Sequence, residues 1–164
     1  MSLVIENGSI VAGADSFATA AELVTYAANF GRTIPADTAA QESLLRRAAL
    51  QMSAMNWKGG LVSELQTLSW PRVDVYRENW LVPSNAIPAQ IKAGQMALAT
   101  EVYADDLAPP ELKTGAVIRE KVGPIDTEYA AATSYTARPA ATRQSYAQFG
   151  PFLESSNQVK MVRG

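Results

Sequence analysis

The stretch TAAQESLLRRAALQMSAM, residues 38–55, carries the clearest helical signal in the chain. Its apolar residues recur at three- and four-residue spacing, which places them on one face of an α-helix. That face consists of Leu44, Leu45, Ala48, Ala49, Met52 and Met55. Thr38 and Gln41 predict a capping box at the start of the helix, and Gly59-Gly60 predict its end.

A second helix is predicted upstream of this one. Either Asp15 or Ser16 can cap it, and it runs to about Phe30, with Gly31 suited to the position after the C-cap. Its apolar positions follow helical spacing: Ala20, Leu23, Val24, Ala27 and Phe30. Before it, Leu3-Val4-Ile5 could pair as a short strand ahead of an Asn-Gly turn.

A third helix is predicted to open at Ile87-Pro88 and to end near Tyr103, before Asp105-Asp106. One row of side chains follows its length: Ile91, Gln95, Leu98 and Val102. A last helix is expected from about Pro139 through Phe149. We therefore expect a mainly α protein, a small bundle of three to five helices with one β-hairpin and an extended C-terminal arm.

The hairpin is predicted at about 116–129, where apolar and polar residues alternate on both sides of Gly123-Pro124. A lone two-stranded hairpin is marginally stable in water, so we expect it to dock on another surface, such as a neighbouring subunit. Glu154–Gly164 has neither helical nor strand period and reads as an extended tail. The predicted organisation is a helical domain over 1–153, with the hairpin inserted, and a tail over 154–164.

Residues 61–86 show little periodicity and carry much of the aromatic content. A short helical turn is expected at Leu61, Leu65 and Leu68. We interpret the tryptophans as a core aromatic cluster that closes one end of the bundle: Trp57, Trp70 and Trp80. The alternative, a stacking surface for bases, requires interleaved cations. Lys58, Arg72 and Arg77 are present, but Glu64, Asp74 and Glu78 offset their charge.

Composition excludes most catalytic chemistry. The chain has 164 residues, 48% of them hydrophobic, which suits one globular domain, and it contains neither cysteine nor histidine. It lacks a nucleophile elbow, a phosphate-binding lysine loop and a dinucleotide-binding glycine run. Asp105-Asp106 is the only adjacent carboxylate pair and reads as a solvated helix end. We predict no enzyme activity, no catalytic residues, no cofactor and no metal.

Charge is unevenly distributed. The net charge is −2, yet the segment from Ala130 onward has four cations and one carboxylate, which hints at a tail with its own partner. No basic residue precedes Arg32, and no apolar run approaches membrane-spanning length. We expect a soluble protein that is cytoplasmic where it is made.

Several motifs, in their order along the chain, resemble those of a family of tailed-bacteriophage structural proteins. They are Trp57-Lys58-Gly59, Leu68-Ser69-Trp70-Pro71-Arg72, Ile87-Pro88, Glu120-Lys121-Val122-Gly123-Pro124 and the terminal Val159-Lys160-Met161-Val162-Arg163-Gly164. Members are often labelled DnaT-like single-stranded DNA-binding proteins, and they look like head-to-tail connector (adaptor) proteins. The resemblance covers nearly the whole chain.

The resemblance implies a structural protein of the virion, located at the head-tail interface. During assembly it would be found in the host cytoplasm. Such adaptors form a homo-oligomeric ring, commonly of twelve copies, under the portal protein. The ring extends the channel through which DNA passes without sequence-specific binding, and it carries the next neck or tail component, a stopper or a tail terminator. No membrane is involved.

The resemblance also implies roles for particular residues. The portal-binding tail would be Gln158, Val159, Lys160, Met161, Val162, Arg163 and Gly164. The hairpin would contact neighbouring subunits or the next neck protein through Val117, Arg119, Lys121, Ile125, Thr127 and Tyr129.

Two other functions stay open. The family label favours single-stranded DNA binding in replication restart, which the positive C-terminal segment and the aromatic residues support and the low isoelectric point of about 5.2 opposes. The other is a cytoplasmic helical regulator that dimerises and for which the tail would be dispensable.

Overall fold

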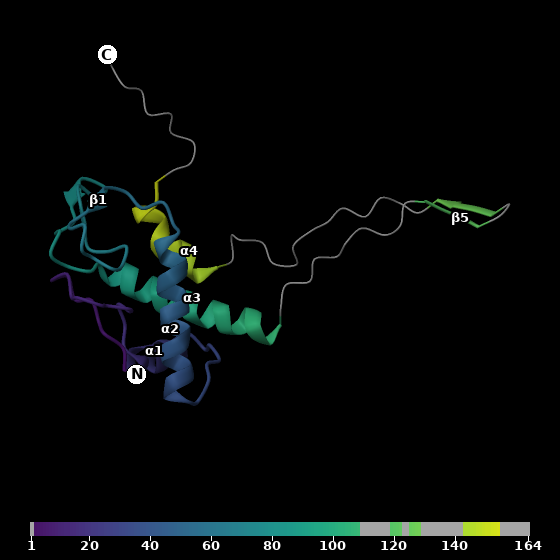
Figure 1. Cartoon of the computed structure of the whole chain (residues 1–164), viewed down its shortest axis with the longest axis horizontal. Helices are drawn as coiled ribbons and strands as arrows, with labels where there is room; N and C mark the ends of the chain where they lie inside the picture. Colours follow the sequence, from purple (N-terminus) through teal and green to yellow (C-terminus); the bar gives the residue numbers. More distant parts are fainter. Residues whose placement is uncertain (1, 109–118, 123–124, 129–142, 155–164) are drawn as a thin grey trace, which may run out of the picture.

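The computed structural model describes residues 2–108, 119–122, 125–128 and 143–154, and Figure 1 shows their arrangement. The predicted class is confirmed: the protein is small and mainly α-helical. The helices are α1 (Ala20–Asn29), α2 (Thr38–Ser53), α3 (Ala89–Leu107), α4 (Gln144–Phe149) and the 3-10 helix η2 (Gly150–Phe152). The strands are β1 (Gly60–Leu61), β2 (Arg72–Val73), β3 (Tyr76–Arg77), β4 (Trp80–Leu81), β5 (Arg119–Val122) and β6 (Ile125–Glu128).

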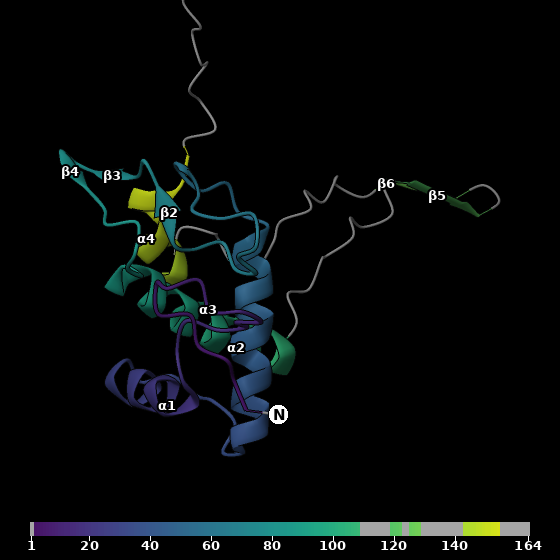
Figure 2. The same cartoon turned by 60° about the vertical axis from the view of Figure 1, so that its left-hand side comes forward.

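Helix α3 is the centre of the body, because it packs against α1, α2 and α4 (Figure 2). The row predicted along it is confirmed as buried: Ile91, Gln95, Leu98 and Val102. Gly94 allows α4 to approach closely, since a Cβ atom there would overlap the Phe149 ring. None of the described helices is long and apolar enough to span a bilayer.

The predicted helix starts were wrong at α1 and α2, although both helices exist. Helix α2 is capped by Asp37, whose carboxylate accepts from the Ala40 N–H at 2.9 Å; Gln41 instead donates to the Pro35 carbonyl at 2.8 Å. Helix α1 is capped by Thr19, which forms a capping box with Glu22. In each case a better-placed cap residue nearby satisfies the free N–H groups of the first turn.

The predicted C-terminal ends of the helices can be compared with the structure in the same way. Gly31 follows α1 with φ +59°, as expected of a glycine after the C-cap, but α2 already ends at Ser53. Helix α3 extends beyond Tyr103 to Leu107, so Asp105 and Asp106 lie within it and bind Arg143 and Arg47. Asp105-Asp106 therefore lies in the last turn of α3, as the helix-end interpretation expected, and Asp106 is exposed; the structure adds the ion pairs with Arg143 and Arg47.

The N-terminal segment is held to the body by the buried amide of Gln95. Its Oε1 accepts from the N–H groups of Phe17 at 2.9 Å and Ala18 at 3.0 Å, and its Nε2 donates to the Leu45 carbonyl at 3.0 Å. One side chain thus joins the N-terminal segment, α2 and α3. Leu3-Val4-Ile5 forms no strand; Ile5 makes a single bridge to Ser16.

The predicted hairpin is confirmed over the described strands, where β5 pairs antiparallel with β6. Its register places Arg119 opposite Glu128 and Lys121 opposite Asp126. Helix α4 begins at Gln144; the expected earlier start at Pro139 and the tail Gln158–Gly164 lie outside the described residues. The division into residues 1–153 and 154–164 therefore stays a prediction.

Candidate functional site: the aromatic end

Two of the three tryptophans form the core that closes one end of the body, together with α4 and η2. The Trp57 ring meets Trp70 and Phe149 edge to face, with centroids 5.8 and 5.2 Å apart, and Trp70 meets Phe152 in the same way at 5.4 Å. Trp70 is fully buried. Edge-to-face pairs add to the stability that burial of aromatic area supplies. We call this part of the molecule, residues 57–86 with α4 and η2, the aromatic end.

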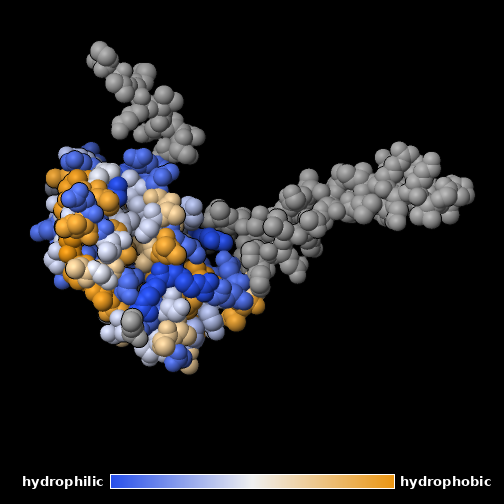
Figure 3. Space-filling view, viewed as in Figure 1, coloured by the Kyte–Doolittle hydropathy of each residue, from blue (hydrophilic) through white to orange (hydrophobic). Residues whose placement is uncertain are grey.

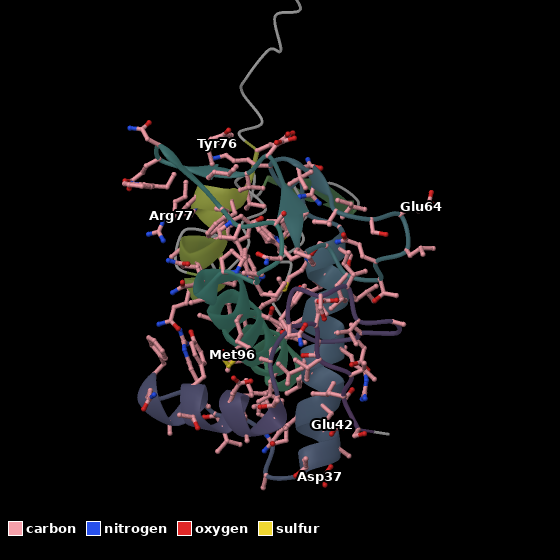
Figure 4. The ribbon with its side chains drawn as sticks, turned by 90° about the vertical axis from the view of Figure 1, so that its left-hand side faces the viewer. Asp37, Glu42, Glu64, Tyr76, Arg77 and Met96 are labelled. Atoms are coloured by element: carbon pink, nitrogen blue, oxygen red, sulfur yellow. The ribbon has the colours of Figure 1, made fainter. Side chains whose placement is uncertain are left out.

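Trp80 does not belong to this core, which corrects the prediction. It is 79% exposed, and the neighbouring Tyr76 and Leu81 are 55% and 57% exposed. The residue that anchors this hairpin is Val75, which is fully buried and accepts the Val82 N–H at 2.9 Å. We call the three exposed hydrophobic side chains of β3 and β4, Tyr76, Trp80 and Leu81, the aromatic tip (Tyr76 is labelled in Figure 4).

The chain between Trp57 and the tip folds as two short antiparallel hairpins, β1–β2 and β3–β4, instead of the expected helical turn at Leu61, Leu65 and Leu68. Gly59 permits the first hairpin: its φ is +72°, and a Cβ atom there would overlap the Val73 carbonyl oxygen. Such two-residue strands leave no alternation that a sequence pattern could show.

Arg72 holds these hairpins together. Its Nε donates to the Lys58 carbonyl and its Nη2 to the Gly59 carbonyl, both at 2.8 Å, and its Nη1 donates to Ser69 at 3.3 Å. Burial lowers the pKa of the guanidinium below its ordinary value, and the nearby charge of Glu154 partly offsets this. Arg72 is therefore a structural clamp whose hydrogen-bonding capacity is used by the backbone.

A shallow pocket of about 430 Å³ opens on the side of the aromatic end, and we call it the lateral pocket. Met55, Leu61 and Leu68 give it an apolar lining, and Glu154 also lines it. Ser69 also lines it, and the Ser69 hydroxyl is buried without a hydrogen-bond partner. Buried polar groups are normally paired, so this hydroxyl and the neighbouring Trp70 indole N–H, which also lacks a partner, are exceptions.

Hydrophobic residues reach the surface at this end of the body, as the orange atoms at the upper left of Figure 3 show. The most exposed apolar side chains of residues 57–86 are Leu61, Leu65, Tyr76, Trp80 and Leu81. They fall in two groups, Leu61 and Leu65 in the β1–β2 segment and Tyr76, Trp80 and Leu81 in the β3–β4 hairpin.

Few cations of the body remain available for phosphate. Residues 2–108 and 143–154 contain eight cations and twelve carboxylates. Four of these cations form ion pairs: Arg46 with Asp15, Arg47 with Asp106, Lys92 with Glu22 and Arg143 with Asp105. Lys58 and Arg72 donate to backbone carbonyls. Within these described ranges, only Arg32 and Arg77 have side chains without a hydrogen bond or ion pair.

The described residues bring together no group of three His, Cys, Asp or Glu side chains that could hold a metal. Of the residues predicted to bind partners, Arg119 and Lys121 lie in β5, and Ile125 and Thr127 lie in β6. The other predicted contacts lie outside the described residues: Val117, Tyr129 and Gln158–Gly164. The tip and the lateral pocket were not predicted as sites, because their exposure depends on tertiary packing.

The fold defines a small, mainly α-helical protein with short antiparallel hairpins. A family described as "Putative DnaT-like ssDNA binding protein" matches residues 1–164, so the chain belongs to that family. No curated protein and no solved structure matches it. The family description names single-stranded DNA binding and mentions neither a portal nor a neck. It therefore agrees with the family label predicted from the motifs and supports single-stranded DNA binding, the alternative function, better than the adaptor role, which stays a prediction.

Proposed function

We propose that the protein is a head-to-tail adaptor of tailed bacteriophages, a ring of copies under the portal that extends the DNA channel. The observation that carries this proposal is the β5–β6 hairpin. It is inserted between α3 and α4, and residues 108–118 and 129–143 connect it to them. An isolated pair of four-residue strands gains stability by packing on another surface, and a neighbouring subunit supplies one in a ring.

The charge of the body supports the same proposal. Its carboxylates outnumber its cations, and most of the cations are engaged within the protein. A channel wall of this kind lets DNA slide, because phosphate contacts made by cations would hold it. In this proposal the hairpin contacts the neighbouring copy or the next neck component, and Gln158–Gly164 docks on the portal. No catalytic step, cofactor or metal is required.

The test is electron microscopy of the purified protein mixed with portal particles. We expect ring density under the portal, and we expect it to be lost when Gln158–Gly164 is deleted. The deletion variant should keep its helical circular dichroism and its melting temperature. Portal particles that stay bare with the full chain, or a tail-less variant that still forms the ring, would contradict the proposal or its docking segment respectively.

We propose single-stranded DNA binding as the second candidate function. The family description supports it, and so does the exposure of Trp80 and Tyr76 beside Arg77, because bases stack on exposed aromatic rings next to cations. The shortage of free cations opposes it. The test is fluorescence anisotropy with a labelled oligonucleotide across salt concentrations. Affinity that falls steeply with salt, and about tenfold or more with Trp80→Ala, would favour this candidate.

A further inference from the structure

The aromatic tip and the lateral pocket lie on opposite sides of the aromatic end. Figure 4 shows Tyr76 and Arg77 on one side and Glu64 on the other; Glu64 lies in the loop between β1 and β2, between Leu61 and Gln66, which line the pocket. A projection and a hollow on different faces of one molecule cannot meet within it. They can meet between two copies in a head-to-tail contact, and such contacts generate rings when the rotation between copies closes.

We propose that the aromatic tip of one copy docks in the lateral pocket of the next copy. This inference rests on the proposed ring and names its subunit contact. Trp80 is the principal side chain, since it is the most exposed member of the tip and large aromatic residues dominate interface energies. Met55, Leu61 and Leu68 receive it.

Charge favours a second copy over a nucleic acid as the occupant. Arg77 sits beside the tip without a hydrogen bond or ion pair in the described structure. Glu154 lines the pocket, and Glu64 belongs to the adjoining loop. These carboxylates attract the arginine of a neighbouring copy and repel phosphate.

The geometry of the contact can be tested by disulfide trapping, because the chain has no cysteine of its own. The double variant Arg77→Cys with Glu154→Cys is mixed with portal particles and, separately, concentrated alone, then oxidised. We expect ladders of cross-linked multimers. The matched control, Arg32→Cys with Glu154→Cys, places its first cysteine away from the tip and should give none.

Charge reversal provides the second readout. Arg77→Glu should weaken self-association, measured by analytical ultracentrifugation, by about tenfold, and adding Glu154→Arg should restore it. Trp80→Ala should weaken it by about tenfold or more, whereas Leu50→Ala, at a similarly exposed apolar site on α2, should leave it unchanged. Both tip variants should keep the wild-type melting temperature.

The outcomes separate this inference from the proposed function. Ring density under the portal without cross-links would overturn the docking contact and leave the adaptor function standing. Cross-links without ring density would support the contact and count against the adaptor. If Trp80→Ala abolishes oligonucleotide binding and leaves self-association unchanged, the tip is a DNA surface and the inference is wrong.

Discussion

The two ends of the body are closed in different ways. At the end formed by α1, α2 and the N-terminal segment, buried polar side chains satisfy the backbone: Gln95 joins three segments, and the Glu6 carboxylate accepts N–H groups from Gly8 and Val11, both at 2.8 Å. At the aromatic end, aromatic rings packed edge to face form the core. Among the described residues, the first end has its buried polar side chains paired internally, whereas the second leaves the Ser69 hydroxyl and the Trp70 indole N–H unpaired and the tip exposed.

The sharpest test of this contrast compares two tryptophans only ten positions apart. Trp70→Ala should lower the free energy of unfolding by about 3–5 kcal/mol, because it empties a fully buried site. Trp80→Ala should change it by less than about 0.5 kcal/mol, because the indole is exposed. Urea denaturation followed by circular dichroism measures both. Equal destabilisation by the two variants would mean that Trp80 is part of the core after all.

We call the end formed by α1, α2 and the N-terminal segment the polar-closed end. The sequence predicted this end better than the aromatic end, because its helices have a periodic pattern of apolar residues. The burial of Leu45 and Met52 follows from their spacing on a 16-residue helix, so α2 was predicted together with its buried face. The caps were misplaced because several polar residues precede each helix and tertiary contacts choose among them; Asp15, for instance, binds Arg46 instead of capping α1. Gln95 was predicted only as a member of a row, because its spacing does not disclose which backbone groups it meets.

The aromatic end could not be predicted in this way. Strands of two residues, such as β1 and β3, have no measurable period, and the clamp made by Arg72 joins carbonyls from separate turns. Apolar composition alone therefore grouped Trp80 with Trp57 and Trp70, although the hairpin holds it outside the core. Sites of this kind depend on contacts between segments, which the local sequence does not encode.

The polar-closed end can be opened at Gln95. Gln95→Leu keeps the apolar contacts but leaves the Phe17 N–H without its acceptor and the Ala18 N–H with only its longer bond to the Ser16 hydroxyl, so we expect a loss of about 2–3 kcal/mol in the free energy of unfolding. Gln51→Leu, on the exposed side of α2, is the matched control and should have little effect. Amide hydrogen exchange should speed up at Phe17 and Ala18. If exchange there is unchanged, Gln95 does not hold the N-terminal segment.

A smaller effect is expected at the cap of α1. Thr19→Ala removes the hydroxyl that accepts from the Glu22 N–H at 3.2 Å, and it should destabilise the protein by about 1 kcal/mol. Thr25→Ala, on the same helix, removes a hydroxyl that only donates to the Ala21 carbonyl, and its effect should stay within about 0.5 kcal/mol. Thermal unfolding distinguishes the two variants. Equal shifts in Tm would show that the Thr19 cap stabilises the protein no more than the Thr25 hydroxyl does.

The smallest effect is a pH dependence at the same helix. Burial raises the pKa of the Glu22 carboxyl, but hydrogen bonds from Lys92 and Thr19 outweigh it, so the pKa lies below its ordinary value of 4.5. Because folding favours the ionised form, this contribution is fully present above pH 4.5 and is lost as the pH falls through the folded-state pKa. The side chain is 41% exposed, so solvent screening keeps the effect small.

Urea midpoints measured from about pH 6 down to about pH 3 should fall less steeply for Glu22→Gln than for wild type. Glu64→Gln, which has no side-chain hydrogen bond to lose, should follow the wild-type curve. A Glu22→Gln curve parallel to that of wild type would show that the pairing of Glu22 with Lys92 adds no stability to this end of the body.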